Sequence, residues 1–495
     1  MKTATLSAIV AAVLASAAPL GAQTASLNAT ADARVLSGAG NTNYGSQDVL
    51  SLHHSSGNVQ RTFVNFDLTG YAGVSLTSDA VLTLRASGSG GTALTGVYLG
   101  TANAAWAENT ITWNNQPGIT VVPGVTNPNG TYAHNSDVTW TVPWYVVEKW
   151  ATTGYHGIGL TSGMNSGRHF LSKEGGVAPK LEFAYADSQD GVWIGGAGNW
   201  TDAGNWQGGS VARGIDRSAT FHGFTAAAAT LDADHTVGSL SFDNADHTIA
   251  AGAGRLAFST TAGIPTVFVG TGRTASIGAP ILGLDGLAKT GTGTLVLNGP
   301  GSTSQSLTAY QGTLEVGGGS LTVANDLFVG GTAFQGNDPS FGTLLVSDGT
   351  MTVNGAFILG QTVNGANQVA QYTQTGGIVN QAGTSLHLAN GGGVSQMDVT
   401  GGTFTSAGTM NVGTRGSAAL NVGGDGTMNV NGLTMGHNAG TATRDTAVNV
   451  TGNGTLNVTG GNIIFSNHAS ASSRYTQTGG AFSFTGGGYF YIGNN

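Results

Sequence analysis

The chain has 495 residues, enough for two or three domains; 83 are glycine, 8% are charged and none is cysteine. The lack of cysteine excludes disulfides and thiolate metal sites, and the regular apolar pattern excludes a disordered chain. The net charge is -9 and no basic run occurs, which argues against nucleic acid as a partner.

A short apolar run follows the charged start of the chain. Residues 4–20 are apolar and alanine-rich, Lys2 precedes them, and the small residues Gly21 and Ala22 follow. This order is typical of a secretory signal peptide. We therefore expect a signal peptide at 1–22 and a mature protein that is secreted, extracellular or on the cell surface. A membrane anchor is the alternative, but the run is short for a bilayer, and no other stretch is long and apolar enough to span one.

Residues 23–186 have the pattern of a separate β module. Apolar and polar residues alternate over 61–67, 80–85 and 181–185, and turns rich in Gly, Ser and Asn separate these stretches. Five tryptophans lie in this module: Trp106, Trp113, Trp140, Trp144 and Trp150. The pattern predicts an antiparallel β-sandwich.

Several motifs of this module occur in a distinctive order. They are Ala31-Asp-Ala-Arg-Val35, Asn43-Tyr-Gly45, Phe63-Val-Asn-Phe-Asp-Leu68, Trp106-Ala-Glu-Asn-Thr-Ile-Thr-Trp-Asn-Asn-Gln-Pro117 and Arg168-His-Phe-Leu-Ser-Lys-Glu174. Together they resemble DNRLRE-type modules, the carbohydrate-binding module family 96. The resemblance implies a jelly-roll-like sandwich that binds polysaccharide, including acidic ones such as alginate. Lys173 stands where that family would have arginine, so an arginine-dependent contact there is not carried over.

A sugar site combines aromatic faces with polar side chains, and acidic sugars add Arg or Lys. The candidates to bind an alginate- or pectin-like polysaccharide are Tyr44, Arg61, Arg85, Trp140, Arg168, His169 and Lys173. Plainer roles remain open: Arg85 can simply pair with an acid, and His169 can be an ordinary surface residue. We expect Trp106 and Trp113 in the core.

Calcium is the one cofactor that the sequence leaves open. Asp32, Asp48 and Asp67 are candidate ligands, although their spacing matches no loop motif. We expect no other cofactor.

A polar linker at 187–191 precedes the second part of the chain, 192–495. Within 192–300 we expect a cap and irregular first coils. Two Gly-Asn-Trp units end at Trp200 and Trp206, and we interpret their rings as the cap, with a sugar platform as the alternative. Gly286-Leu-Ala-Lys-Thr-Gly-Thr-Gly-Thr-Leu295 resembles the autotransporter-associated β-strand repeat, which implies a β-helical passenger or surface protein.

Residues 311–495 repeat one unit of three short alternating strands seven times. Gly and Asn between the strands suit tight corners. This predicts a right-handed parallel β-helix with three sheets. The inward pairs of the third strands would be Leu327/Val329, Phe357/Leu359, Leu386/Leu388, Met410/Val412, Leu433/Met435, Ile463/Phe465 and Phe490/Ile492. The repeat ends without a cap, so we expect the chain to be a truncated fragment.

The coils offer little catalytic chemistry. Glu315 and Asp398 fall in one row but three coils apart, about 14 Å at ~4.8 Å per coil. Paired glycosidase carboxylates need ~5–9.5 Å. We therefore expect a secreted, non-catalytic polysaccharide-binding protein whose β-helix is a rigid stalk. A surface structural protein or adhesin is the first alternative and a β-helical lyase or hydrolase the second. The sequence predicts no oligomeric state.

Overall fold

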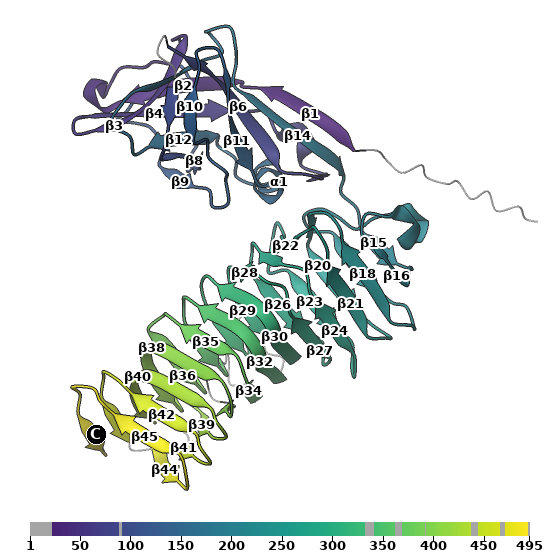
Figure 1. The fold of residues 1–495 in the computed structure, drawn as a ribbon, viewed down its shortest axis with the longest axis vertical. Coiled ribbons are helices and arrows are strands. Elements are labelled where there is room, and N and C mark those ends of the chain that lie inside the picture. The colour runs from purple at the N-terminus through teal and green to yellow at the C-terminus, as the bar shows by residue number, and fades with distance from the viewer. Residues whose placement is uncertain are drawn as a thin grey trace, which may run out of the picture.

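The computed structural model describes residues 22–88, 92–331, 341–361, 369–391, 393–436, 444–465 and 471–493. The expected signal peptide, 1–22, lies almost wholly outside them. The described chain is nearly all β, with an antiparallel sandwich at one end of a long parallel coil (Figure 1). The expected fold class is confirmed. This part of the chain has no helix with the length and apolar character needed to cross a membrane.

The sandwich is built from one twelve-stranded antiparallel sheet and a separate two-stranded one, β7–β10. Its strands are β1 (Gln23–Asn28), β2 (Ala31–Leu36), β3 (Val49–Ser55), β4 (Asn58–Asn65), β5 (Val74–Leu76), β6 (Ala80–Ser87), β7 (Thr92–Leu94), β8 (Val97–Ala102), β9 (Ile119–Val121), β10 (Gly130–Tyr132), β11 (Asp137–Val142), β12 (Ile158–Ser162), β13 (Arg168–Leu171) and β14 (Lys180–Asp187). Alternation explains its core: in β6, Leu82, Leu84 and Ala86 are buried, while Val81, Thr83 and Arg85 are partly exposed.

One helix, α1 (Trp144–Thr152), was not predicted. It starts directly after Pro143. Trp144, Val147 and Glu148 share one buried face, at the spacing of neighbours on a helix.

The second part begins at the end of β14 and forms one 32-stranded parallel sheet wound into a coil. Its first strands are β15 (Gly191–Trp193), β16 (Ala197–Asn199), β17 (Ser218–Phe221), β18 (Ala227–Leu231), β19 (His235–Val237), β20 (Ser239–Phe242), β21 (His247–Ala251), β22 (Leu256–Phe258), β23 (Thr266–Val269), β24 (Thr274–Ile277), β25 (Ile281–Gly283), β26 (Leu287–Thr290), β27 (Thr294–Leu297), β28 (Ser302–Ser304) and β29 (Leu307–Ala309). Trp200 and Trp206 are fully buried against Phe221, where a cap would place them, and the sugar-platform alternative is wrong.

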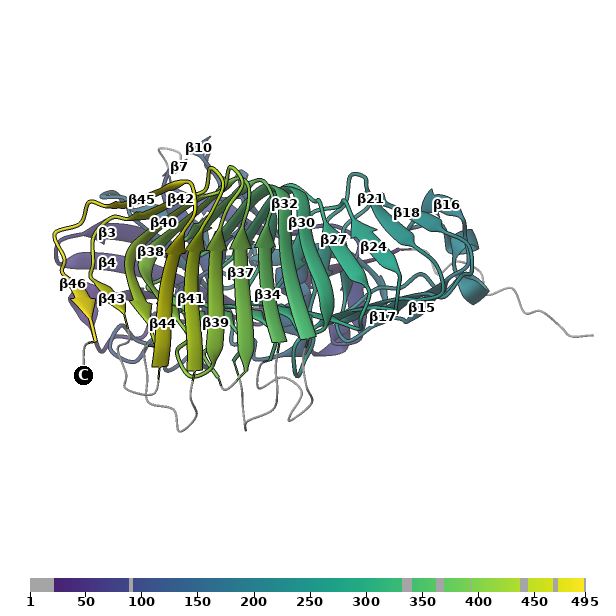
Figure 2. The same ribbon diagram turned by 90° about the horizontal axis from the view of Figure 1, so that it is seen from below.

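The regular coils follow in three parallel ladders. The first contains β30 (Gly312–Val323), β32 (Phe341–Val353), β34 (Val369–Gln374), β37 (Val394–Val399), β39 (Ser417–Val422), β41 (Arg444–Val450) and β44 (Ala471–Gln477), and Figure 2 shows its later members side by side. The second continues from β30 and β32 through β35 (Ile378–Gln381), β38 (Thr403–Val412), β40 (Thr427–Met435), β42 (Thr455–Val458) and β45 (Ala481–Phe484). The third contains β31 (Leu327–Val329), β33 (Phe357–Leu359), β36 (Ser385–Leu388), the ends of β38 and β40, β43 (Ile463–Phe465) and β46 (Phe490–Ile492).

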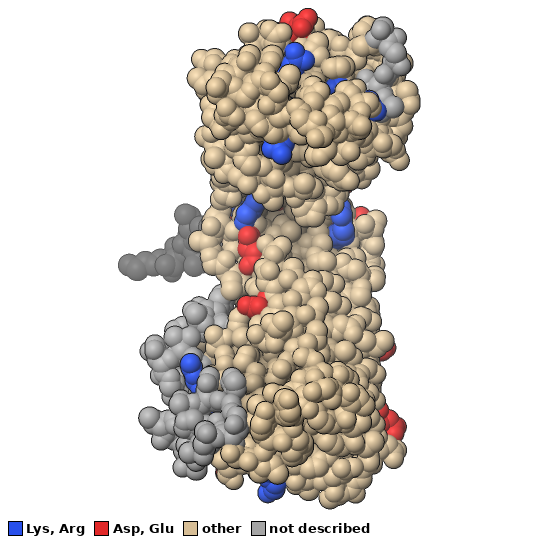
Figure 3. All heavy atoms as spheres, turned by 90° about the vertical axis from the view of Figure 1, so that its left-hand side faces the viewer, with Lys and Arg blue, Asp and Glu red and all other residues tan. Residues whose placement is uncertain are grey.

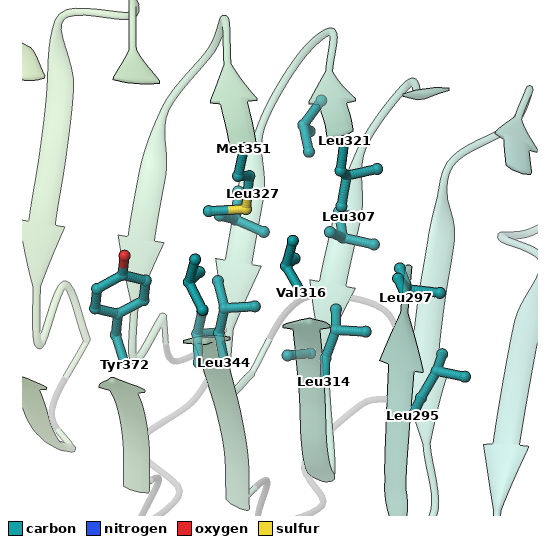
Figure 4. Close-up of a cluster of buried hydrophobic side chains, with 14 of the residues drawn as sticks. Leu295, Leu297, Leu307, Leu314, Val316, Leu321, Leu327, Leu344, Met351 and Tyr372 are labelled. Carbon is teal, nitrogen blue, oxygen red and sulfur yellow. The ribbon is translucent and has the colours of Figure 1, made fainter. Parts of the chain in front are cut away.

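Equivalent side chains stack in columns inside the coil. Leu295, Leu314, Leu344 and Tyr372 are partners in successive strands and have no exposed surface (Figure 4). Each such burial is worth ~1.5–3 kcal/mol.

The predicted inward pairs of the third strands are confirmed from Leu327/Val329 through Leu433/Met435. In the next pair Ile463 is buried and Phe465 is half-buried. The exception is Phe490/Ile492, which is 52% and 81% exposed because no described coil stacks on it.

The sandwich docks on the coil through α1. Apolar residues of the coil extend the sandwich core, since Ala257 and Leu284 pack against it. The Trp144 indole donates to Thr236 Oγ1 at 3.1 Å. Lys149 Nζ lies 2.7 Å from Asp285 Oδ2. Figure 3 shows charged side chains of both signs at the junction between the sandwich and the coil, whereas most of the visible surface is uncharged.

Candidate functional site

Four side chains from three separate motifs form a basic and aromatic group, which we call the arginine cluster: Arg34, Tyr44, Arg168 and His169. Arg34 lies on β2, with its guanidinium carbon 5.1 Å from the centre of the Tyr44 ring. Arg168 and His169 begin β13. Burial, then the charge of Arg34, then that of Arg168 lower the pKa of His169. The charges of both guanidinium groups therefore reach the imidazole.

The Trp106–Pro117 motif holds Tyr44 in place. The Asn43 side-chain amide donates to the carbonyl oxygens of Glu108 and Ile111, both at 2.7 Å. At Gly45 the backbone passes so close to this motif that a Cβ would lie 2.1 Å from the Glu108 carbonyl. Glycine is therefore required beside Tyr44, which explains why Asn43-Tyr-Gly45 and the longer motif occur together.

The cluster keeps donors free. Arg34 Nε and Arg168 Nε are buried atoms with no hydrogen-bond partner among the described residues. Neither guanidinium has an ion pair there, although Arg168 Nη1 donates to the Gly167 carbonyl at 2.9 Å. Burial lowers the pKa of Arg168. Two cations with unused donors beside an aromatic ring form a site suited to an anion.

Other candidate residues line a separate depression of about 410 Å³, which we call the lysine groove. Its lining includes Asn28, Thr83, Arg85, Asp137, Lys173 and Lys180. Its cations already have carboxylate partners. Arg85 Nε lies 2.7 Å from Asp137, and Lys180 lies 3.0 Å from Glu182. The groove therefore carries little unpaired positive charge. The simpler prediction for Arg85, that it pairs with an acid, is confirmed.

Arg61 belongs to neither group. Its guanidinium lies over Trp113, 5.0 Å from the ring centre, and donates to Gln116 Oε1 at 3.2 Å. Trp113 and Trp106 are partly exposed and pack against the small core of Phe63 and Ile111. The prediction that both tryptophans belong to the core is thus confirmed, and they lie at its edge.

Trp140 cannot stack against a sugar. It has no exposed surface and packs against Phe170 with ring centres 6.0 Å apart. The prediction was wrong because alternation in β11 points Val138, Trp140 and Val142 inward together.

Three carboxylates meet at the joint of three motifs, and we call them the carboxylate triad: Asp32, Glu108 and Glu174. One oxygen from each lies within 4.8 Å of those of the other two. Lys173 Nζ bridges the two glutamates, 2.9 Å from Glu108 Oε2 and 2.5 Å from Glu174 Oε1. These bonds, to Glu174 first, raise the pKa of Lys173, and burial raises that of Asp32 to about 7.

Of the three candidate calcium ligands, only Asp32 belongs to a described group of carboxylates. Asp48 and Asp67 do not join the described group around Asp32. Asp67 instead accepts from the amide and hydroxyl of Thr69 in a local turn, which lowers its pKa.

The coil places Glu315 and Asp398 where the repeat predicted, in one row separated by Leu345 and Thr373. Both carboxylates have neighbours: Ser347 donates to Glu315, and Asn421 donates to Asp398 at 2.6 Å. Within the described chain this row offers no close carboxylate pair.

Sequence reasoning missed Arg34, Glu108 and Glu174 as site residues. A signal was present, because all three lie inside the motifs that carried the family resemblance, and Arg34 is two residues after Asp32 on one strand.

Comparison with protein families gives one match, to carbohydrate-binding module family 96 over residues 23–185. That span is about a third of the chain. The autotransporter-associated repeat found no match. No curated protein matched the chain. Residues 23–185 are therefore a carbohydrate-binding module family 96 domain, and a long parallel β coil follows it. The presence of this domain suggests carbohydrate binding.

Proposed function

We propose that this is a secreted, non-catalytic protein that binds an acidic polysaccharide through the arginine cluster, with the coil as a rigid stalk. The family match supports carbohydrate as the ligand class. The observation that carries the acidic preference is that, among the described residues, neither the Arg34 nor the Arg168 guanidinium has a carboxylate partner.

The cluster divides the recognition of a uronic acid among its members. Arg34 and Arg168 offer planar forks that match a carboxylate. Tyr44 offers a ring to the C–H face of a pyranose, although Arg34 covers part of it. His169, whose pKa is lowered, is mostly uncharged at neutral pH and serves as a hydrogen-bonding group for a hydroxyl.

The ion pairs argue for the arginine cluster over the lysine groove. A sugar carboxylate entering the groove would compete with Asp137 for Arg85 and with both glutamates for Lys173. At the cluster it would compete with no carboxylate of an ion pair among the described residues. The module carries nine acidic and seven basic residues over 24–186, so binding depends on this local patch and not on bulk charge.

A surface structural or adhesive role remains the alternative, and one feature of the coil favours it. Phe341, Val369 and Val394 are partners in successive strands and are 57%, 47% and 54% exposed. An exposed apolar row of this kind suits contact with another protein. A β-helical lyase or hydrolase is the second alternative, but Glu315 and Asp398 in the coil are separated by two strands and form no close pair.

Affinity electrophoresis of the mature chain in gels with alginate, polygalacturonate or a neutral glucan tests the proposal. We expect retardation by the acidic glycans that weakens with salt. Arg34→Ala and Arg168→Ala should each weaken it about fivefold to tenfold, and Arg85→Ala, the matched control from the groove, should not. Equal mobility in all gels would refute binding. Retardation lost only in Arg85→Ala would move the site to the groove.

A further inference from the structure

The carboxylate triad joins the three most distinctive motifs of the module. Asp32 comes from β2, Glu108 from the loop between β8 and β9, and Glu174 from the turn after β13. The Asp32 amide donates to Glu108 Oε1 at 2.8 Å, and the Lys173 amide donates to Asp32 Oδ2 at 2.8 Å. The backbone therefore fixes the carboxylates close together, against their mutual repulsion.

One oxygen of the triad has nothing to bind. Asp32 has no exposed surface, and its Oδ1 has no hydrogen-bond partner in the described part of the chain. Buried polar atoms in folded proteins are almost always satisfied, by protein, water or an ion. A buried carboxylate oxygen in a group of three carboxylates calls for a donor or a cation and not for another acceptor.

Lys173 supplies only part of the missing charge. Its ammonium contacts Glu108 and Glu174, and among the described residues no ion pair joins it to Asp32. The side chain is 27% exposed, so its four-carbon stem can turn the ammonium toward solvent. The ammonium thus occupies the position from which a metal ion would bind both glutamates.

We propose that Asp32, Glu108 and Glu174 bind a divalent cation, with Ca²⁺ preferred, and that the Lys173 ammonium competes for that position. Three carboxylates supply hard oxygen ligands, and glutamates can bind Ca²⁺ with one or two oxygens. Ca²⁺ also tolerates irregular geometry, whereas Mg²⁺ demands a near-ideal octahedron. Bound there, the ion would tie the three motifs of the module together.

Thermal unfolding of the full mature chain in EDTA, CaCl₂, MgCl₂ or NaCl of matched ionic strength provides the test, with Tb³⁺ luminescence as the direct binding readout. We expect Ca²⁺ to raise the Tm of the module more than Mg²⁺ does. Asp32→Asn and the more exposed Glu174→Gln should each weaken Ca²⁺ binding by about tenfold or more. The second variant covers the case in which Asp32→Asn does not fold.

Lys173→Met distinguishes competition from mere proximity. Without the ammonium, the variant should be less stable than wild type in EDTA, bind Ca²⁺ more tightly, and gain more in Tm from it. Lys180→Met, which removes a lysine paired with Glu182 outside the triad, is the control and should respond as wild type does. A wild-type chain with no Ca²⁺-specific change in Tm and no Tb³⁺ signal would overturn the proposal, whatever the variants do.

Discussion

Glu148 should make the docking of the sandwich on the coil sensitive to pH. This side chain is 1% exposed, at the interface between α1 and β19. Its Oε1 accepts from Ser75 Oγ at 2.8 Å and the Leu76 amide at 2.7 Å, and its Oε2 accepts from Thr236 Oγ1 at 2.5 Å. Burial outweighs these bonds and raises its pKa from 4.5 to about 7.

The numbers of protons bound by the folded and unfolded states decide whether stability rises or falls with pH. Between pH 4.5 and pH 7 the folded state holds a proton on Glu148 that the unfolded state has released. Folding is therefore favoured at low pH, and stability falls as pH rises through this window. A shift of this size corresponds to about 3 kcal/mol, most of it lost between pH 5 and pH 7. For a module of this length, that is roughly 6–12 °C in Tm.

The assay is calorimetric unfolding of wild type and Glu148→Gln from pH 5 to pH 8. The glutamine side chain of the variant cannot titrate, so the unfolding free energy of its module should fall less with pH, by about 3 kcal/mol. The difference between the chains isolates Glu148, because Asp32, which titrates in the same window, is present in both. Identical pH profiles for the two chains would refute the reasoning.

The neighbouring groups do not produce the same effect. The ion pairs of Lys149 with Asp285 and of Arg255 with Asp234 and Asp79 are present in both chains. His235, next to Thr236, is also buried, which lowers its pKa from 6.5 to about 4. Between these values stability rises with pH, opposite to the effect of Glu148, and this contribution is the same in both chains.

Three further predictions concern the coil. Lys289, 1% exposed, donates to the carbonyls of Thr290, Gly291 and Gln311, so Lys289→Met should lower the unfolding free energy by roughly 3 kcal/mol in guanidinium titrations, and an unchanged midpoint would contradict this role. Trp200→Ala leaves a cavity in the cap and should cost about 3–5 kcal/mol, measured as a lower Tm of the coil's transition. Incubation of the chain with a polysaccharide panel should release no reducing ends or unsaturated products; release that disappears in Asp398→Asn would establish an enzyme.

The repeat was predictable because each coil depends on local alternation. Leu314 and Val316 point inward and Glu315 points outward because side chains alternate along a strand. The same alternation recurs in every coil, so the sequence alone predicts which residues of successive coils are paired. The same rule applies to Trp140, because Val138 and Val142 on either side of it in β11 are also apolar and alternation buries all three.

Long-range pairing could not be predicted. Glu148 finds Thr236, 88 residues away, and Lys149 finds Asp285, 136 residues away. Nothing in the local pattern of either partner specifies the other. The ion pairs of the candidate site could not be predicted either. Only the folded structure shows that Arg85 and Lys173 are paired with acids, while Arg34 and Arg168 have no such pair among the described residues.

The docking contact bears on how a stalk would work. A module on a free linker gains avidity by searching space, whereas a docked one presents its site in a fixed direction. Here the short connection is itself ordered, since Gln189 pairs with Arg213 and the Ser188 amide donates to the Gly73 carbonyl. The buried Glu148–Thr236 bond and the Ala257 contact then hold α1 against the coil. Under the proposed function, and if the coils of neighbouring molecules are aligned on a surface, their arginine clusters face one way, and a long polyanion can bind several at once. Weakening the dock, by high pH or by removal of Lys149, should therefore reduce avidity for long chains while leaving the affinity for a single short oligosaccharide unchanged.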